Sequence, residues 1–227
     1  MLRSLFFSIA LLLSASAHAA RPFVTDDARL TRAGGCQLES WTRLYSNSSE
    51  LWALPACNPG GNLEVTLGTG LSRQHGAGTT ADYVLQLKTL FRELQPNGWG
   101  IGIAAGVISH PEASPGPNQL GNRYLYIPYS ASFMDDALVI HLNLGVLRDR
   151  ETDRHSATWG SGAELALTPR LSGVAEMYGD DRGGRFYQTG LRYSVIPQLL
   201  QLDSTVGQRV DGMRDDAWLS FGLRYTP

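Results

Sequence analysis

The sequence predicts an all-β fold: a single antiparallel transmembrane β-barrel of about twelve strands, preceded by a cleaved signal peptide. Apolar and polar residues alternate with a period of two along most of the chain, as they do when side chains alternate between the faces of a strand. The alternating stretches are about nine to eleven residues long, enough for a tilted strand to cross a bilayer. Charged residues make up only 18% of the chain although the mean hydropathy is −0.15. This balance fits an apolar outer face combined with a polar interior.

Residues 1–19 have the features of a secretory signal peptide. Arg3 supplies a positive charge, residues 5–13 form a short apolar run, and Ala17-His18-Ala19 provides small residues at a cleavage site. The apolar run is too short for a membrane-spanning helix. We therefore expect an exported mature chain that begins at Ala20.

Residues 20–35 show no periodicity and contain Pro22 and the pair Gly34-Gly35. They are predicted to form an irregular periplasmic lead-in, or to fold into the lumen as a plug. Residues 36–227 then form the barrel, and its last strand includes Trp218 to Tyr225, with one apolar and one mixed face.

The strands are predicted from the alternation of apolar residues. The second is the weakest prediction, because Pro55 lies inside it and proline cannot donate to a β-ladder. The predicted strands are 37–45, 51–57, 63–71, 83–92, 99–108, 125–133, 138–146, 160–167, 171–178, 187–193, 200–206 and 217–225.

The connections between these strands alternate between short and long, as in barrels with short periplasmic turns and long external loops. Proline, glycine and aspartate mark the short turns near residues 59–61, 96–98, 135–136, 169 and 197. The long, polar connections are 74–81, 110–122, 148–155, 179–185 and 210–216. An even strand number returns the carboxyl terminus to the side on which the barrel begins.

The chain has two cysteines, Cys36 and Cys57, and an exported protein can form disulfides. A hairpin turn between Ser46 and Asn47 would place the two cysteines opposite each other on the first two strands. We therefore predict a disulfide between them; the alternatives are two free thiols or a metal site, for which two cysteines are few ligands.

The second face of each predicted strand carries the charged residues, which we expect to line the lumen. Their role is either a selectivity lining for small polar or aromatic anionic solutes, or a structural network of paired charges inside a filled or plugged barrel. Inward glycines such as Gly160 and Gly162 favour a passage, because they leave space. The predicted lumen-lining residues are Glu39, Arg43, Glu64, Lys88, Arg92, His141, Glu164, Glu176, Arg192, Asp203 and Arg224.

Other functions are less well supported by the sequence. The net charge of −2 gives no reason to expect nucleic-acid binding, and no cofactor or metal ligand set is indicated. A lipid hydrolase of the outer membrane would need a nucleophile beside a histidine, but no serine follows His141 on the same face of its strand. A third possibility is a structural or adhesion barrel with a filled lumen.

The last strand also resembles the carboxy-terminal signal by which the outer-membrane assembly machinery recognises barrels. The resemblance rests on Ser220, Gly222 and Tyr225, although the usual final aromatic residue is missing after Thr226-Pro227. It implies the barrel-assembly machinery as a partner during insertion.

The mature start, Arg21-Pro-Phe-Val-Thr-Asp-Asp-Ala28, followed by Gly34-Gly35 and Gln37-Leu-Glu39, resembles the family of outer-membrane barrels named for the MetA pathway of phenol degradation. The resemblance covers about twenty residues and implies a transporter-like barrel, without assigning substrate-binding residues. We therefore expect a barrel in the bacterial outer membrane, among its lipids and lipopolysaccharide, that forms a passage for small, aromatic or anionic solutes. The solute and the oligomeric state are not predicted.

Overall fold

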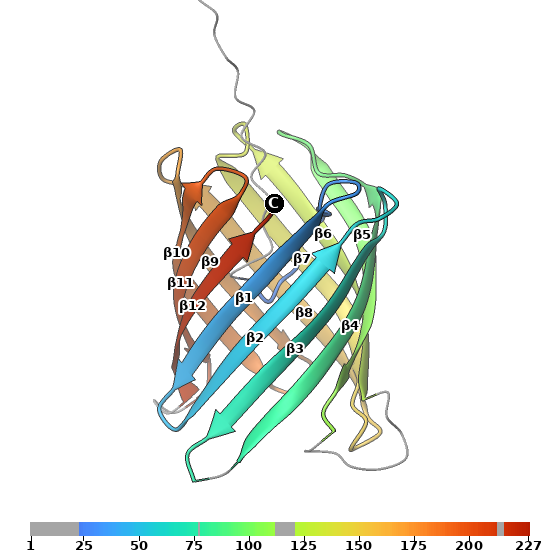
Figure 1. Cartoon of the computed structure of the whole chain (residues 1–227), viewed down its shortest axis with the longest axis vertical. Coiled ribbons are helices and arrows are strands. Elements are labelled where there is room, and N and C mark those ends of the chain that lie inside the picture. The colour runs from blue at the N-terminus through green and yellow to red at the C-terminus, as the bar shows by residue number, and fades with distance from the viewer. Residues whose placement is uncertain (1–22, 77, 112–120, 213–215) are drawn as a thin grey trace, which may run out of the picture.

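The computed structural model describes residues 23–76, 78–111, 121–212 and 216–227, which form one closed barrel of twelve antiparallel strands (Figure 1). Each strand pairs with the next, and the first pairs with the last, so the sheet has no open edge. The predicted fold class and strand number are confirmed. The predicted signal peptide lies outside the described residues. The strands are β1 (Cys36–Tyr45), β2 (Ser48–Cys57), β3 (Glu64–Gln74), β4 (Thr79–Arg92), β5 (Trp99–Ser109), β6 (Asn122–Phe133), β7 (Leu138–Arg148), β8 (His155–Ala166), β9 (Leu171–Asp180), β10 (Arg185–Ile196), β11 (Leu200–Arg209) and β12 (Trp218–Tyr225).

Strand β2 belongs to the barrel wall in spite of its proline. Pro55 is paired with β1 opposite Leu38, whereas the pairing with β3 is interrupted between Ala53 and Ala56 without a change of register. Because proline lacks the amide hydrogen, one side of the strand loses its ladder locally while the other is kept.

The first hairpin has the predicted geometry. Cys36 lies opposite Cys57 in the β1–β2 register, and the two are joined by a disulfide. The turn consists of Ser46 and Asn47, as the spacing of the cysteines predicts. The disulfide therefore ties the start of the barrel wall to the end of its second strand.

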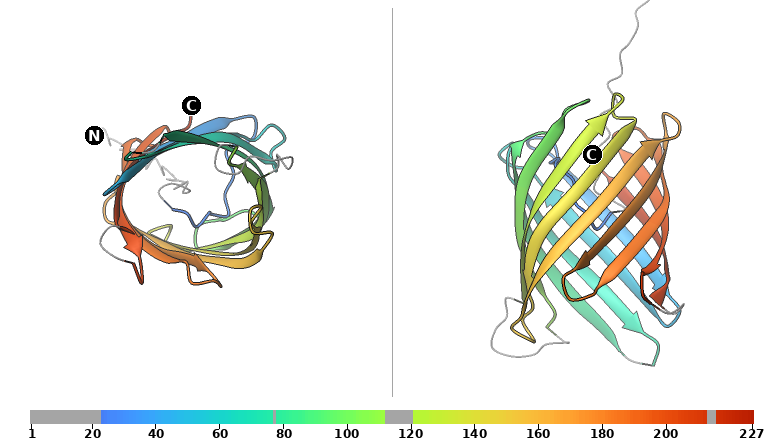
Figure 2. Two further views of the ribbon diagram at one scale, coloured as in Figure 1. Left: turned by 90° about the horizontal axis from the view of Figure 1, so that it is seen from below. Right: turned by 180° about the vertical axis from the view of Figure 1, so that it is seen from behind.

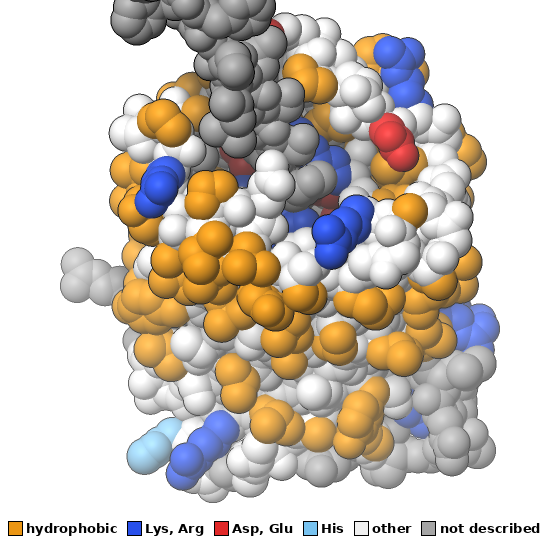
Figure 3. Space-filling model, turned by 45° about the horizontal axis from the view of Figure 1, so that its top comes forward, with side chains coloured by type: hydrophobic (Ala, Val, Ile, Leu, Met, Phe, Trp, Pro, Cys, Tyr) orange, Lys and Arg blue, Asp and Glu red, His pale blue; other side chains and the backbone are white. Residues whose placement is uncertain are grey.

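The outer wall is apolar and the inner wall is polar. Outward side chains such as Leu144 and Leu67 are 69% and 60% exposed, whereas the inward His141 is fully buried. Figure 3 shows hydrophobic side chains gathered in a band on the outer wall, with charged side chains at the rim. Among the described residues, no helix combines the length and hydropathy needed to cross a bilayer.

The two ends of the barrel differ less in connection length than the sequence predicts. We call the end with the carboxyl terminus the turn end and the opposite one the loop end (Figure 1). The loop-end connection 181–184 matches the turn-end connection 134–137 in length, and 149–154 matches 93–98. The predicted strict alternation of short and long connections is therefore wrong, because several strands extend beyond their predicted ends at the loop end.

Candidate functional site in the barrel lumen

A stretch of the described residues before β1 runs inside the barrel. Residues 23–31, which we call the lumen segment, lie within the ring of strands when the barrel is viewed along its axis (Figure 2). Phe23, Thr25 and Ala28 are buried there. An irregular backbone has unpaired amide groups, so its burial requires hydrogen-bond partners from the wall.

Two glutamates of the wall supply those partners. Both carboxylate oxygens of Glu176 accept backbone N–H groups, from Val24 at 2.7 Å and from Thr25 at 2.9 Å. Near the other end of the segment, Glu64 accepts the N–H of Thr31 at 2.7 Å and its hydroxyl at 2.6 Å. Each glutamate accepts two hydrogen bonds from the segment, so the two side chains fix it at two points.

Lys88 binds the acidic centre of the lumen segment. Its ammonium group lies 2.8 Å from the Asp26 carboxylate and 3.3 Å from that of Asp27, and the Tyr126 hydroxyl donates to Asp26 at 2.6 Å. Burial alone would raise the pKa of the Asp27 carboxyl, but Lys88 and Arg29 hold that pKa below its usual range. Asp27 therefore stays ionised at neutral pH, paired with a buried cation.

A second network lies deeper in the wall, around His141. Its Nδ1 is 2.8 Å from the Ser130 hydroxyl and its Nε2 is 3.2 Å from the Glu164 carboxylate. Arg192 donates to the other oxygen of Glu164 at 2.6 Å. The Phe23 ring packs on this network, with its centroid 5.6 Å from that of His141.

Ser130, His141 and Glu164 have the connectivity of a nucleophile, a base and an orienting acid. Sequence reasoning missed Ser130 because it lies on β6, across the ladder from His141 on β7. The Ser130 hydroxyl accepts the N–H of Ala28 at 2.9 Å and is fully buried. With the lumen segment in place, the hydroxyl anchors backbone and has no access to a substrate.

The predicted lumen residues lie on the inner wall with one exception. Arg43 and Glu39 are partly buried on β1, Asp203 lies opposite Arg192 in the β10–β11 register, and Arg224 lies opposite Glu39. Arg224 also donates to Gln37 at 2.6 Å. The buried members of the predicted set are Glu64, Lys88, His141, Glu164, Glu176, Arg192, Asp203 and Arg224.

Arg92 is the exception, and its predicted place in the lumen is wrong. A β-bulge between Leu90 and Arg92 shifts the register, so that Arg92 pairs with the outward Ile101. Its side chain is exposed, and its guanidinium carbon lies 4.1 Å from the centroid of the Trp99 ring. The alternation rule fails at this position because the bulge inserts one residue.

The inward glycines make room for large side chains instead of opening a channel. A Cβ atom at Gly160 would lie 2.5 Å from the Thr25 hydroxyl, and one at Gly162 would lie 3.2 Å from the Phe23 ring. On the opposite wall, a Cβ atom at Gly70 would lie 2.7 Å from Trp52. The space that the sequence indicates is present, but the lumen segment and inward aromatic rings fill it.

Several cavities remain along the barrel, including one of about 340 Å³ beside Ala28 and Arg29 at the turn end. Beside the lumen segment lies a cavity of about 60 Å³, bordered by Asp26 and Lys88, with room for a few water molecules. At the loop end a larger cavity, which we call the vestibule, has a volume of about 470 Å³. The vestibule is lined by Arg43, Tyr45, Ser46, Asn47, Ser48, Tyr178, Phe186, Asp216 and Trp218.

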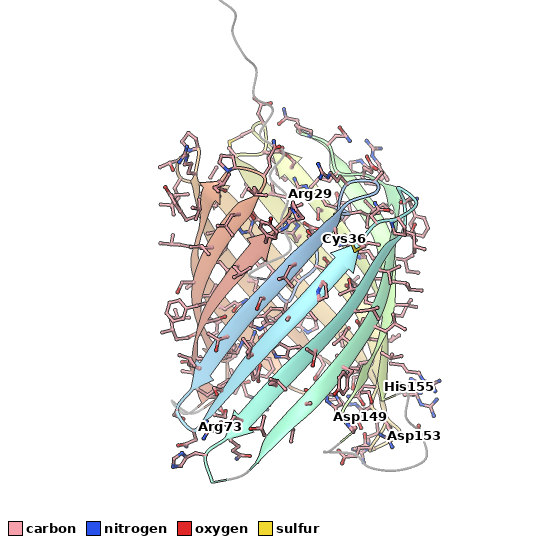
Figure 4. The ribbon with its side chains drawn as sticks, viewed as in Figure 1. Arg29, Cys36, Arg73, Asp149, Asp153 and His155 are labelled. Atoms are coloured by element: carbon pink, nitrogen blue, oxygen red, sulfur yellow. A yellow bond between two sulfur atoms is a disulfide. The ribbon has the colours of Figure 1, made fainter. Side chains whose placement is uncertain are left out.

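The labelled side chains of Figure 4 mark the two ends of this arrangement. Arg29 and Cys36 lie toward the turn end, where Arg29 is 3.9 Å from Asp136. Asp149 and His155 lie toward the loop end, where His155 begins β8. The lumen segment therefore reaches the turn end at Arg29, and the vestibule lies at the opposite end.

The three residues of the predicted assembly signal, Ser220, Gly222 and Tyr225, lie on β12. Ser220 and Gly222 lie on the inner face of β12, and Tyr225 points outward with 42% of its surface exposed. Recognition by the assembly machinery remains a prediction. Among the residues in the described ranges, no group of three or more His, Cys, Asp or Glu side chains could hold a metal ion.

The closed twelve-stranded wall defines the class: the chain has the fold of outer-membrane porins and channels. It is similar to the KdgM porin, with a TM-score of 0.65 at 10% identity over 83% of this chain and 98% of that one. It is also similar to the NanC porin, with a TM-score of 0.59 at 10% identity over 83% and 97%. For the COG4313 outer membrane channel from Pseudomonas putida F1 the TM-score is 0.57, at 10% identity over 88% and 97%.

The chain belongs to the family described as Uncharacterised conserved protein UCP029691, whose model matches residues 8–225. This match does not confirm the resemblance to the family named for the MetA pathway. None of the curated proteins matches the chain in sequence.

Proposed function

We propose that this chain is an outer-membrane passage for small solutes whose lumen is closed by its own lumen segment. The observation that supports this proposal most strongly is that wall residues bind the segment: Glu176, Glu64 and Lys88 each contact it directly. In the outer membrane the apolar band contacts lipid, and lipopolysaccharide surrounds the loop end. Solute then crosses when the segment leaves the wall.

The likeness in fold to porins and channels supports a passage, and the complex of the KdgM porin with disordered oligogalacturonate shows that such a barrel can admit an acidic saccharide. Support for a plug comes from the lumen itself. The segment is held by polar contacts, and polar contacts can be exchanged for water when a segment is released, whereas an apolar filling would resist hydration.

Single-channel recording in a planar bilayer tests this function. The refolded mature chain, residues 20–227, is compared with a chain that begins at Arg32 and lacks the lumen segment. We expect rare, brief openings of the mature chain and stable openings of the shortened one. Both proteins must first show the same β-sheet signal by circular dichroism.

A structural barrel with a filled lumen is the second candidate, because the inward aromatic rings already occupy part of the space. This candidate predicts that removal of the lumen segment leaves the barrel silent. The Ser130, His141 and Glu164 arrangement is tested in the same preparations: ester hydrolysis that appears in the shortened chain and disappears with Ser130→Ala would favour an enzyme.

A further inference from the structure

The vestibule is lined by a row of aromatic rings contributed by four strands. The ring centroids of Tyr45 and Trp218 are 6.0 Å apart, those of Trp218 and Phe186 are 6.3 Å apart, and those of Phe186 and Tyr178 are 5.4 Å apart. These separations lie within the range of interacting aromatic pairs. The row gives the cavity an apolar wall against which a flat ring can pack.

Arg43 provides the positive charge of the same cavity. Its guanidinium carbon is 4.9 Å from the centroid of the Trp218 ring, and its side chain is 15% exposed. Stacking on the indole holds the guanidinium. One terminal N–H donates to the Tyr45 hydroxyl at 3.4 Å, whereas the Nε–H has no partner among the described residues. Carboxylates match the forked donor geometry of arginine.

Two buried donors in the vestibule have no hydrogen-bond partner among the described residues. They are the Nε–H of Arg43 and the indole N–H of Trp218, whose side chain is 5% exposed. A buried donor without an acceptor is costly. A ligand that carries acceptor oxygens would satisfy such donors, and a purely apolar ligand would not.

The acidic groups nearby leave Arg43 incompletely neutralised. The Glu50 carboxylate is 4.0 Å from its nearest guanidinium nitrogen, longer than a hydrogen bond, and also accepts the indole N–H of Trp52 at 3.3 Å. Asp216 lines the cavity from the side of β12. These carboxylates disfavour a doubly charged anion more than a monoanion.

The vestibule continues toward the lumen segment. A second cavity of about 240 Å³ shares Tyr178 and Phe186 with it and is lined at its inner end by Val24 and Thr25. The vestibule itself falls within the roughly 300–1,000 Å³ of small-molecule sites. A solute bound there lies on the path that the lumen segment blocks.

We propose that the vestibule binds a small, singly charged carboxylate that contains a ring. The ring packs on Trp218 and Phe186, and the carboxylate binds the guanidinium of Arg43. This inference deepens the proposed function, on which its role in transport rests. Both an aromatic acid and a sugar acid have this chemistry, and the test separates them.

Isothermal titration of the refolded, full mature chain in detergent measures binding without any requirement for transport. Benzoate and galacturonate are the two ring-bearing acids, benzyl alcohol lacks the charge, and acetate lacks the ring. We expect saturable binding of at least one ring-bearing acid and much weaker binding of the other two probes. Preference for benzoate identifies an aromatic acid, and preference for galacturonate identifies a sugar acid.

Substitutions at the vestibule give the residue-level test. We expect Arg43→Gln to weaken binding about tenfold or more, because a charged hydrogen bond is lost. Trp218→Phe keeps a ring but removes the indole N–H, and should weaken binding about threefold. Glu50→Gln should strengthen binding, because it removes the carboxylate that competes for Arg43.

Arg185→Gln is the matched control. Arg185 is also near the loop end and is paired with Asp211, but it lies outside the vestibule and is exposed. Its substitution changes the net charge by the same amount and should leave binding unchanged. Arg43→Lys retains the charge, so it should bind more tightly than Arg43→Gln even if both barrels are less stable than the parent.

Equal binding of benzoate and benzyl alcohol would overturn the proposal, as would unchanged affinity in Arg43→Gln. Binding with the expected residue dependence in a barrel that never conducts would keep the site and contradict the proposed passage. Conductance in the shortened chain without saturable binding of either acid would keep the passage and contradict the site.

Discussion

The middle of the lumen and its loop end are built from different side chains. Around the lumen segment the wall contributes charged groups, and these are paired with the segment, as Lys88 is with Asp26. At the loop end the wall contributes mainly aromatic rings and Arg43, whose distance to Glu50 is 4.0 Å. One region already has its binding partner inside the chain, and the other lines the vestibule.

This difference assigns closure of the lumen to the middle region and recognition of a solute to the loop end. Losing one partner of a buried ion pair is strongly destabilising, so the paired charges favour the closed position of the segment as long as both partners are present. The aromatic rings of the vestibule and the incompletely paired Arg43 leave a surface that a solute can bind. The predictions below test whether the two regions respond differently to equivalent substitutions.

The largest effect is expected for Lys88→Met, which leaves two aspartates of the lumen segment without their main cation. Loss of one member of a buried ion pair typically costs about 3–5 kcal/mol, and we expect this loss to release the segment. Labelling of a cysteine introduced by Thr25→Cys with a maleimide should accelerate strongly. The two native cysteines are bonded to each other and do not react.

Arg43→Met is the control for that substitution, since it removes a positive charge at the other region. It should leave labelling at position 25 unchanged. Equal acceleration by the two substitutions would mean that the regions are not distinct.

A smaller effect is expected for Glu176→Gln. The amide keeps one acceptor oxygen but replaces the other with a donor, which faces a backbone N–H of the lumen segment. An unsatisfied buried donor costs about 1–3 kcal/mol, so labelling at position 25 should rise, though less than in Lys88→Met. Glu50→Gln, the same change beside Arg43, should not affect it.

The smallest effect is expected for Asp27→Asn, on the pH dependence of the release of the lumen segment. The pKa of Asp27 in the folded protein is below the usual value, so its contribution to segment binding is complete above the unfolded pKa of about 4 and is lost as the pH falls through the folded value. Asp27→Asn should therefore remove part of the acid-induced opening below about pH 4. If the two proteins differ only between pH 5 and pH 7, the direction assigned to this pKa is wrong.

The sequence predicts the wall of the barrel because the alternation of apolar and polar residues is a local pattern that recurs in every strand. Alternation places Glu164 and Glu176 on the inner face correctly, and the spacing of Cys36 and Cys57 gives the first register. Alternation fails at Arg92, where a bulge adds a residue to one strand. Nothing in the local pattern of β4 marks that bulge.

The contents of the lumen are less predictable, because they depend on contacts between residues far apart in the chain. The sequence leaves open whether residues 20–35 form a lead-in or a plug. Inward glycines show that space is left inside the barrel, but not whether a segment of the chain fills it. The pairing of Ser130 with His141 requires the register of two strands. Trp218 could have been noticed as an aromatic residue on the polar face of the last strand.

The central claim is that solute passes only when the lumen segment leaves the wall, and a reversible lock tests it most directly. The Cβ atom of Thr25 lies 3.2 Å from the position of a Cβ atom at Gly160, so a small shift allows a disulfide in the double variant Thr25→Cys, Gly160→Cys. Recording with reductant on the parent chain controls for the native disulfide. We predict that the oxidised variant is silent and that reduction restores the openings of the parent, while the chain that begins at Arg32 stays open throughout. An oxidised variant that conducts as well as the shortened chain would contradict the account.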